Sequence, residues 1–365
     1  MINISQEQPE RSAREVTVHF VPQWPGNPYH ASLATNLLGQ GVRVEDEDRL
    51  KFIWIKCRRS GVKPQIVHIH AIPSFCLALL PLLRSCFFYY RLVALRMSGV
   101  KIVWTIHDIS HHEAEFPQLE NFYSRIVFNI VDFVIVHSEG ARKAIESQWR
   151  VRSNERLTVI PHGDYISSYP NHGDRILARN KLGVLSTRMV FLFFGYIRPY
   201  KGVDELITVF KKLKLNNCEL VIAGNPLNDE ISERIRLSIN GDTRIHYLPG
   251  RVKDDELQNI FNAADVVVLP YSKVLTSGAL ILAMSFGCAC IVPKIRIFEE
   301  ALDADGGIFY DPEEPDGLRH ALLSAYRGRS GLQLMGKRNF KKVSGSQWSE
   351  SARLTADVYR RCLGY

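Results

Sequence analysis

The chain has 365 residues, a length that allows two domains of ordinary size, and its content of 46% hydrophobic and 23% charged residues is typical of globular proteins. A formal net charge of +8 favours anionic partners, and nucleotide-sugars, nucleic acid and an acidic membrane surface are the candidates. The seven cysteines are irregularly spaced and form no CxxC pair, which indicates a reducing compartment and argues against a disulfide framework.

The first fifteen residues are polar and contain no apolar stretch, so no secretory signal is expected there. Residues Phe75–Met97 are strongly apolar, but Pro81 and three arginines interrupt them, so a membrane-spanning helix is not expected. Ten basic residues and no acidic residue lie between Arg49 and Lys101. Two interpretations stay open: a basic, aromatic helix that docks on an anionic membrane, and a buried helix whose arginines extend to the surface. We expect a cytoplasmic protein, which the first interpretation would place on the inner face of the plasma membrane.

The first half of the chain alternates apolar runs with helical patterns, which is typical of a parallel sheet covered by helices. A helix is predicted at His30–Leu38, and another begins at Ser138, a favourable N-cap residue. The predicted strands are Val16–Val21, Gln65–His70, Lys101–Ile106, Phe133–Val136 and Leu157–Ile160.

The alternation stops over residues 165–188, where the turn-rich stretch Tyr169–Asp174 predicts a domain boundary. It then resumes up to a long final helix, Trp348–Leu363. The predicted strands of this half are Met189–Phe194, Glu219–Ala223, Ile245–Leu248, Val266–Leu269, Ala289–Val292 and Gly306–Tyr310. The sequence therefore predicts an α/β fold with two doubly wound parallel sheets. The expected divisions are a first domain at 1–170, a second at 171–345 and a C-terminal segment at 346–365 that crosses back to the first.

A pair of cations follows the first strand of the second half. Gly195 ends this strand, and Arg198 and Lys201 come next, just before an amphipathic run, Val203–Leu213, that predicts a helix. Two fixed cations in such a strand–loop–helix unit suit a polyanion, and a diphosphate is the obvious one. The alternative is a pair of solvated charges on an ordinary surface loop.

A second motif follows the strand that ends at Pro270. The small residues Thr276-Ser277-Gly278-Ala279 open an apolar helix. Small side chains let backbone amides approach a ligand closely, and the N-terminus of a helix adds positive potential. The alternative is an ordinary loop in which a threonine or serine caps the helix.

In their order along the chain, with Ala223-Gly224-Asn225 between them, these motifs resemble glycosyltransferases of the GT-B fold, in particular family 4 and its close relatives. The resemblance covers most of the chain and is clearest from about 157 to 295. It implies two Rossmann-like domains facing each other across a cleft. The second would hold a nucleotide-sugar donor, and the first would hold a glycan or polyprenyl-linked oligosaccharide acceptor.

The resemblance also implies roles for particular residues. Arg198 and Lys201 match the family's Gly-Arg-x-x-x-Lys-Gly stretch, although the spacing of the arginine differs, and they would contact the donor diphosphate. The resemblance would place four further residues at the donor diphosphate: Thr276, Ser277, Gly278 and Ala279. Those near the nucleobase and ribose would be Gly195, Gly224, Gly250, Arg251 and Val252. Those near the acceptor would be Asn27, Tyr29 and His162.

Glycosyl transfer from a nucleoside diphosphate places negative charge on the leaving phosphate, which fixed cations or a metal must stabilise. Arg198, Lys201 and a helix N-terminus supply positive charge, and the sequence offers no persuasive set of metal ligands. We therefore expect metal-independent catalysis without a cofactor. Nucleic acid is not an expected partner, because the basic excess surrounds an apolar helix rather than a groove with exposed aromatic residues.

An inverting route would also need a base for the acceptor hydroxyl. The loop after the third strand is rich in candidates, and the resemblance places its His107-Asp108 step facing the sugar. The predicted catalytic residues are His107, Asp108 and Glu113, with His111 and His112 beside them. Two alternatives stay open for this loop: a Zn²⁺ site and a cap of the following helix.

The chain departs from family 4 in one respect that bears on mechanism. The family's Glu-x7-Glu pair would occupy positions that here hold Val274 and Leu282. The loop Leu-Thr-Ser-Gly-Ala-Leu, together with His162 and Tyr165 in His-Gly-x-Tyr, looks more like a branch of bacterial exopolysaccharide mannosyltransferases, some of them inverting β-mannosyltransferases. This favours GDP-mannose as the donor. A degenerate, non-catalytic binding protein and another GT-B enzyme, such as a sugar-nucleotide epimerase, remain as alternatives.

Overall fold

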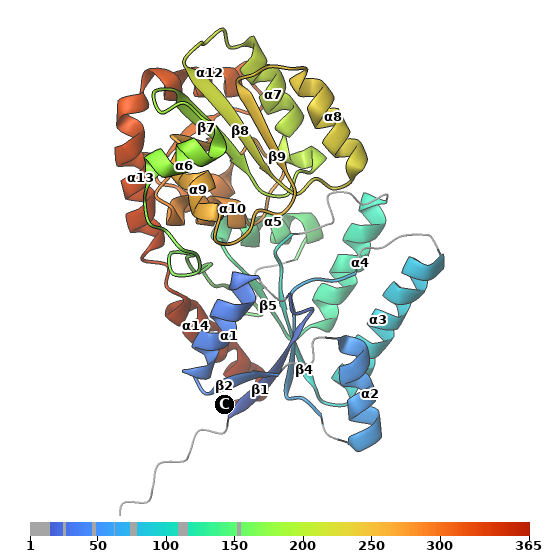
Figure 1. The fold of residues 1–365 in the computed structure, drawn as a ribbon. Coiled ribbons are helices and arrows are strands. Elements are labelled where there is room, and N and C mark those ends of the chain that lie inside the picture. The colour runs from blue at the N-terminus through green and yellow to red at the C-terminus, as the bar shows by residue number, and fades with distance from the viewer. Residues whose placement is uncertain are drawn as a thin grey trace, which may run out of the picture.

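The structure is a computed structural model and describes residues 15–24, 27–45, 49–61, 63–73, 79–108, 116–151 and 155–365. It contains two six-stranded sheets, one in each half of the chain, and every strand pair in them is parallel. In Figure 1 the sheet of the second half lies above that of the first. The prediction of an α/β fold with two doubly wound parallel sheets is confirmed.

The first sheet has the strand order β2-β1-β3-β4-β5-β6. Its strands are β1 (Val16–Val21), β2 (Val42–Glu45), β3 (Ile66–Ile69), β4 (Lys101–Thr105), β5 (Phe133–Val136) and β6 (Leu157–Val159). The sequence pattern does not predict β2, because this edge strand has four residues and only Val42 is fully buried. The other strands lie within two residues of their predicted bounds.

The second sheet has the strand order β12-β11-β10-β7-β8-β9. Its strands are β7 (Met189–Phe194), β8 (Cys218–Gly224), β9 (Ile245–Pro249), β10 (Val266–Val268), β11 (Ala289–Pro293) and β12 (Gly307–Tyr310). All six are predicted, because strands buried on both faces form continuous apolar runs. β7 illustrates this: its first five residues are fully buried.

Helices cover both faces of each sheet, as Figure 1 shows. The first domain contains α1 (Pro28–Leu38), α2 (Leu50–Ser60), α3 (Leu79–Met97), α4 (Pro117–Ile130) and α5 (Glu139–Trp149). The rest of the chain contains α6 (Arg175–Leu182), α7 (Val203–Lys212), α8 (Asp229–Ile239), α9 (Leu257–Ala263), α10 (Gly278–Ser285), α11 (Arg296–Ala301), α12 (Gly317–Arg327), α13 (Arg329–Val343) and α14 (Trp348–Leu363). Ser138 caps α5 as predicted, since its hydroxyl accepts a hydrogen bond from the N–H of Ala141.

Helix α6 lies in the region where the sequence pattern is lost. Its boundaries are local, because the Asp174 carboxylate caps its N-terminus and Gly183 ends it in the left-handed conformation. The helix is anchored by Arg179, whose side chain is 1% exposed and donates to the Asp265 carboxylate at 2.7 Å. The predicted division at residue 170 falls between β6 and α6.

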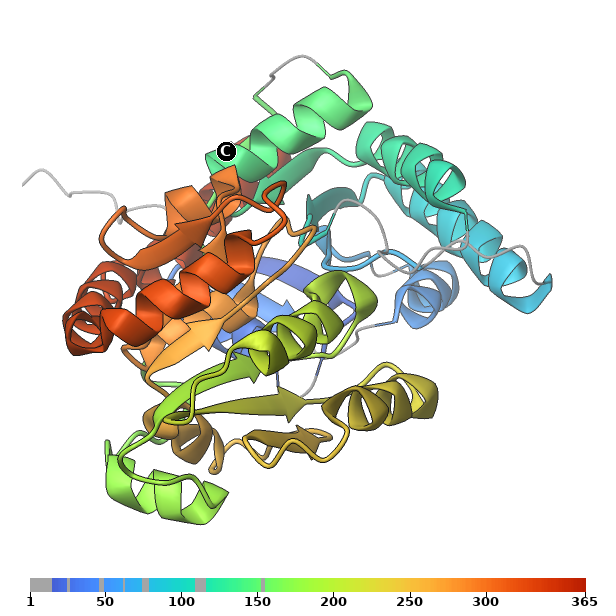
Figure 2. The same ribbon diagram turned by 90° about the horizontal axis from the view of Figure 1, so that it is seen from above.

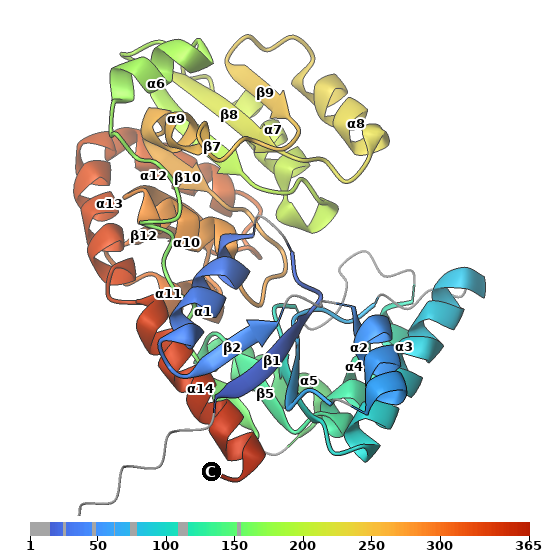
Figure 3. The same ribbon diagram turned by 60° about the horizontal axis from the view of Figure 1, so that its bottom comes forward.

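The last helix returns to the first domain. α14 packs along α1, and the Arg360 guanidinium donates to the carbonyl of Gln40. The buried Tyr359 hydroxyl lies 2.6 Å from Nδ1 of His68, the penultimate residue of β3. Figure 3 shows α14 running beneath the second domain and beside the first sheet.

The chain therefore crosses between the domains twice, and the two crossings touch. The indole N–H of Trp348 donates to the carbonyl of Asp164, and the Ser351 hydroxyl donates to that of Pro161. A Cβ on Gly163 would lie 2.3 Å from the Trp348 ring, so only glycine fits beneath this indole. None of the described helices is both long and apolar enough to cross a membrane.

Candidate active site

The loops that follow the strands of the two sheets meet between the domains (Figure 3). Parallel strands end at one edge of their sheet, and ligands of such folds bind at that edge. The residues predicted from the sequence to bind donor and acceptor lie in these loops, on opposite sides of the domain boundary. The second domain is described first.

Three of the predicted glycines end neighbouring strands. Gly195, Gly224 and Gly250 stand at the carboxyl ends of β7, β8 and β9, with φ of 130°, 151° and 112°. A Cβ on Gly224 would lie 1.7 Å from the carbonyl oxygen of Gly195, so both the conformation and the space require glycine there. A Cβ on Gly195 would lie 3.8 Å from that of Ala279, which places this edge beside the N-terminus of α10.

The two predicted cations lie together in the loop after β7. Arg198 precedes a single 3₁₀ turn, Pro199–Lys201, and the ammonium of Lys201 lies 4.1 Å from the ring centroid of Tyr271. Burial lowers the pKa of Lys201, and the positive charge of Arg198 lowers it further, whereas Tyr200 and Asp108 act in the opposite direction. Lys201 is therefore no solvated surface charge. A bound anion would relieve the unfavourable burial of its ammonium.

The N-terminus of α10 completes the donor side. Ser277 caps the helix, because its hydroxyl oxygen accepts the N–H of Leu280 at 3.2 Å. The capping alternative drawn from the sequence is thus present, and it leaves the amides of Gly278 and Ala279 at the open helix end. The Oγ1 atom of the neighbouring Thr276 is buried without a hydrogen-bond partner in the structure. A Cβ on Gly278 would lie 3.8 Å from the Tyr165 hydroxyl, which brings the interdomain segment to this helix end.

The predicted nucleobase contacts lie next to these loops. Arg251 extends into solvent, with its side chain 72% exposed, and lies 3.7 Å from the Asp254 carboxylate. Val252 packs against the core of the second domain. The two positions that hold the family's glutamate pair have apolar surroundings in this structure. Leu282 is buried, and Val274 packs against the same core.

The first domain contributes a cluster that the sequence analysis largely missed, which we call the imidazole layer. It consists of His30, His68, His70, His107, His137 and His162. Successive ring centroids lie 4.2 to 5.9 Å apart. Only two of its members are predicted site residues. The signal was present in the sequence, since β3, β4, β5 and β6 are each followed by a histidine within three residues.

The hydrogen bonds of three members determine which ring nitrogen carries the proton. Nδ1 of His137 lies 2.9 Å from the carbonyl of Ile160 and must donate to it, which leaves Nε2 as an acceptor. His162 donates in the same way to the carbonyl of Gly163, and its Nε2 accepts from the Tyr165 hydroxyl at 3.3 Å. In His30 the order is reversed, because Nδ1 accepts the N–H of Trp24 at 3.1 Å.

Burial keeps the layer uncharged. It lowers the pKa of His30 and His137 to about 4 and that of His68 and His162 to about 3. The pKa values of His70 and His107 lie well below the usual value for the same reason, and neighbouring imidazoles add to the effect. At neutral pH this wall of the site therefore carries no positive charge from its histidines.

The predicted acceptor residues have mixed surroundings. Asn27 caps α1, because its side-chain oxygen accepts the N–H of Tyr29 at 3.0 Å. Tyr29 is 5% exposed, and its ring lies 5.0 Å from that of His107 and 5.1 Å from that of His162. Tyr29 is thus a packing centre of the imidazole layer. Asp108 is exposed and lies three residues after the end of β4, and Glu113, with His111 and His112, lies outside the described residues.

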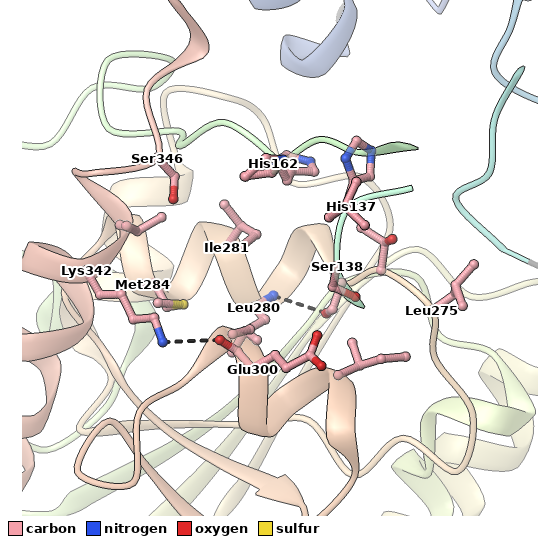
Figure 4. Close-up of a pocket in the computed structure, with 17 residues that line it drawn as sticks. His137, Ser138, His162, Leu275, Leu280, Ile281, Met284, Glu300, Lys342 and Ser346 are labelled. Atoms are coloured by element: carbon pink, nitrogen blue, oxygen red, sulfur yellow. Dashed lines mark hydrogen bonds between the residues drawn. The ribbon is translucent and has the colours of Figure 1, made fainter. Parts of the chain in front are cut away.

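A cavity of about 310 Å³ lies between the domains, and His162 and Thr276 are among the residues that line it. Figure 4 shows His137, Ser138 and His162 on the side of the first domain, opposite Leu280, Ile281 and Met284 of α10. At its edge the Glu300 carboxylate accepts the N–H of Gly140 at 2.7 Å, a contact from α11 to the N-terminus of α5. In the described part of the chain, no three or more His, Cys, Asp or Glu side chains are placed to hold a metal ion.

Two family models match the chain, one in each domain: "Glycosyltransferase Family 4" over residues 4–163 and "Glycosyl transferases group 1" over residues 174–342. Together with two facing Rossmann-like sheets and a cationic loop at a helix N-terminus, these matches show that the chain belongs to the glycosyltransferases of the GT-B fold.

Curated relatives are similar over part of their length. A GDP-mannose:glycolipid 4-beta-D-mannosyltransferase of Xanthomonas campestris pv. campestris is 26% identical over 241 residues, which are 65% of this chain and 63% of the relative. A D-inositol 3-phosphate glycosyltransferase of Mycobacterium marinum is 23% identical over 282 residues, 73% of this chain and 59% of the relative. The matches thus span less than two thirds of either relative.

Solved structures support the fold. Sucrose-phosphate synthase from Thermosynechococcus elongatus superimposes with a TM-score of 0.76 at 15% identity, over 96% of this chain and all of that one. HepE of Anabaena, solved in complex with UDP and glucose, gives a TM-score of 0.70 at 16% identity, over 95% of this chain and all of that one.

The imidazole layer makes stability depend on pH. Histidines with lowered pKa values bind protons in the unfolded chain below about pH 6.5 but stay neutral in the native state down to about pH 4. The free energy of unfolding is therefore expected to fall as the pH is lowered from 7 to 5, by up to about 1.4 kcal/mol per pH unit for each such histidine. Urea denaturation at a series of pH values measures this slope.

The variant His137→Asn, whose amide can still donate to Ile160, should reduce that slope by about one proton. The control variant is His320→Asn. The side chain of His320 is 57% exposed, so this substitution should leave the slope unchanged. Equal slopes for wild type and His137→Asn would contradict the neutral state inferred for this imidazole.

Proposed function

We propose that this protein transfers mannose from GDP-mannose to a hydroxyl of a glycolipid or another glycan acceptor in polysaccharide synthesis. The observation that carries the proposal is that the two domains line the site differently, one with positive charge and the other with neutral imidazoles. Arg198, Lys201 and the N-terminus of α10 form a cationic wall, and the neutral imidazole layer with Asp108 forms the other. The choice of mannose rests on the Xanthomonas relative and on the Thr276–Ala279 loop of this chain.

The cationic wall suits the leaving group. When the bond between the anomeric carbon and the β-phosphate oxygen breaks, negative charge gathers on the departing GDP. Arg198, Lys201 and the open amides of α10 supply hydrogen bonds and positive potential to that charge. Because these charges are fixed in the protein, the proposed reaction needs no divalent metal.

The other wall suits the acceptor. In the proposed step the acceptor oxygen attacks the anomeric carbon, and its proton passes to a base. We assign the base to the Asp108 carboxylate, which is exposed and close enough to Lys201 to influence its charge. His107, which burial holds neutral, is assigned to a hydrogen bond with a hydroxyl of the transferred sugar.

The apolar residues at the family's glutamate positions favour a second candidate, a nucleotide-sugar-binding protein without turnover. Leu282 and Val274 leave two expected sugar and ribose contacts without a carboxylate. The two candidates share donor binding and differ in chemistry, so release of GDP from GDP-mannose in the presence of acceptor glycolipid separates them.

A fold feature supports work at a membrane surface. The side of α3 that faces away from the sheet carries an exposed apolar stripe, made of Leu83, Phe87, Tyr90, Val93 and Met97. Arginines flank it, and the guanidinium of Arg91 lies 5.3 Å from the centre of the Phe87 ring. Figure 2 shows α2 and α3 at the edge of the molecule, clear of the second domain. We propose that this face docks on an anionic bilayer, where a lipid-linked acceptor would reside.

The cationic wall predicts a loss of donor affinity. Arg198→Gln and Lys201→Met should each weaken GDP-mannose binding by about 1.5–3 kcal/mol, because each removes a charge-assisted hydrogen bond to the diphosphate. Isothermal titration calorimetry measures the change. The control Lys212→Met removes an exposed charge at the end of α7 and should bind like the wild type. Unchanged affinity in both site variants would refute the diphosphate assignment.

The fixed cations also predict behaviour toward chelators. Turnover of GDP-mannose should be the same with and without EDTA, since Arg198, Lys201 and α10 supply the charge that a divalent metal supplies in metal-dependent transferases. GDP release is the readout. An activity that is lost in EDTA and restored by Mg²⁺ or Mn²⁺ would contradict metal independence while leaving the donor assignment intact.

The exposed stripe of α3 predicts binding to vesicles of anionic phospholipid, weakened by salt because exposed charges are screened over about 8 Å at physiological ionic strength. The double variant Arg84→Glu with Arg91→Glu should reduce binding by about 2 kcal/mol or more, at about 1 kcal/mol per cation. The control Lys337→Glu with Lys341→Glu changes the same charge on α13 and should bind normally. If the wild type does not float together with the vesicles at low salt, the stripe is not a membrane-docking surface.

A further inference from the structure

An exposed tryptophan stands at the edge of the candidate site, outside every residue set assigned above. Trp24 lies in the loop between β1 and α1, and 39% of its surface is exposed. Large aromatic side chains are costly to leave in water, and they are enriched where proteins bind other molecules. Trp24 does not belong to the hydrophobic core clusters of the described residues in the first domain.

The indole is held in one orientation. Its ring stacks on that of His30, with centroids 5.1 Å apart and planes within 9° of parallel. The backbone N–H of Trp24 also donates to Nδ1 of the same imidazole. His30 is itself 2% exposed and packs edge-on against Phe20 at 5.7 Å. A ligand that binds this indole therefore loses little side-chain entropy, because the ring is already ordered.

Trp24 is also continuous with the reaction centre. From its ring the imidazole layer runs through His30 and His70 to His107, in steps of 5.1, 4.4 and 5.9 Å between centroids. His107 is the member beside Asp108, at the wall assigned to the reacting hydroxyl. Two imidazole rings, those of His30 and His70, stand between Trp24 and His107 in this series, so the two ends of the layer would contact different sugars of one chain.

The chemistry of the layer suits an uncharged sugar chain. A pyranose has a face of C–H groups that packs on the electron-rich face of an indole, and hydroxyls around its edge that hydrogen-bond. The layer adds no charge that would favour an anionic ligand, since burial lowers the pKa of its histidines.

We propose that Trp24 is the stacking platform for a second sugar ring of the acceptor, one position removed from the sugar that receives the transferred residue. The proposal rests on the proposed glycosyltransferase function and extends it: the acceptor is an oligosaccharide of at least two neutral sugars, and Trp24 selects for the second. A single sugar would reach His107 but not Trp24.

The test compares one-sugar and two-sugar probes by saturation-transfer NMR with GDP present. Methyl cellobioside and methyl mannobioside are expected to bind the wild type at least tenfold more tightly than methyl β-glucoside or methyl mannoside. Trp24→Ala should lose this preference, and Trp24→Phe should retain part of it, because a smaller aromatic ring still stacks. Trp54→Ala, which removes a partly exposed tryptophan of α2, should bind like the wild type.

Donor affinity separates this proposal from the one on which it rests. The Kd of Trp24→Ala for GDP-mannose should equal that of the wild type. A Trp24→Ala protein that keeps the two-sugar preference would overturn the platform, as would a wild type that binds neither disaccharide more tightly than its monosaccharide. A wild type that fails to bind GDP-mannose would instead overturn the donor assignment, and the glycoside comparison would still decide the role of Trp24.

Discussion

The contact between Trp348 and the segment Pro161–Tyr165 is the constraint on which the site depends. Two crossings of the chain between the domains are tied together there, by the indole N–H on the Asp164 carbonyl and by the tight fit of the ring over Gly163. The same indole packs on Tyr29 at 5.2 Å and on His162 at 5.5 Å. The Trp348 indole therefore holds both the interdomain segment and the imidazole layer in place. A displacement of the first would reach the second through a single side chain.

This arrangement also explains the electrical contrast between the two walls. Tyr29, Trp348 and the strands of the first sheet exclude water from the imidazoles, and burial makes protonation unfavourable. Across the domain boundary, the Lys201 ammonium lies against the ring of Tyr271, close enough to Arg198 for the two positive charges to interact. Positive charge is thereby confined to the side where the leaving diphosphate would lie. A layer of protonated histidines would instead compete for the same anion from the wrong domain.

Helix α3 shows how two opposed interpretations of a sequence can each describe half of an element. Phe88, Leu92 and Leu95 are buried against the first domain, as expected of a core helix. Phe87 and Met97 on the opposite side are 52% and 83% exposed, as expected of a docking surface. The helix is apolar on both faces: one is buried in the first domain, and the other stays largely exposed, with only Tyr90 among its described stripe residues in ring contact with α2, through Trp54.

The sequence by itself determined the order and type of most elements. Strands such as β7 and β8 are buried on both faces, so their continuous apolar runs mark them without any tertiary information. The cations after β7 and the small residues before α10 could be recognised for a similar reason, because loop chemistry at a strand end is local. The sequence pattern did not predict β2 and α6, because a short edge strand and a polar, eight-residue helix carry little periodic signal.

Only the tertiary structure decided what the histidines do. His30, His68, His70 and His137 are separated by up to about a hundred residues, and each alone is an unremarkable residue at the end of a strand or in a helix. Parallel pairing brings these ends to one edge of the sheet, and α14 closes over them from the far end of the chain through Tyr359. Burial, and with it the neutral state of the layer and the fixed pose of Trp24, is a property of that assembly. No local pattern encodes it, because desolvation depends on which distant segments cover a side chain.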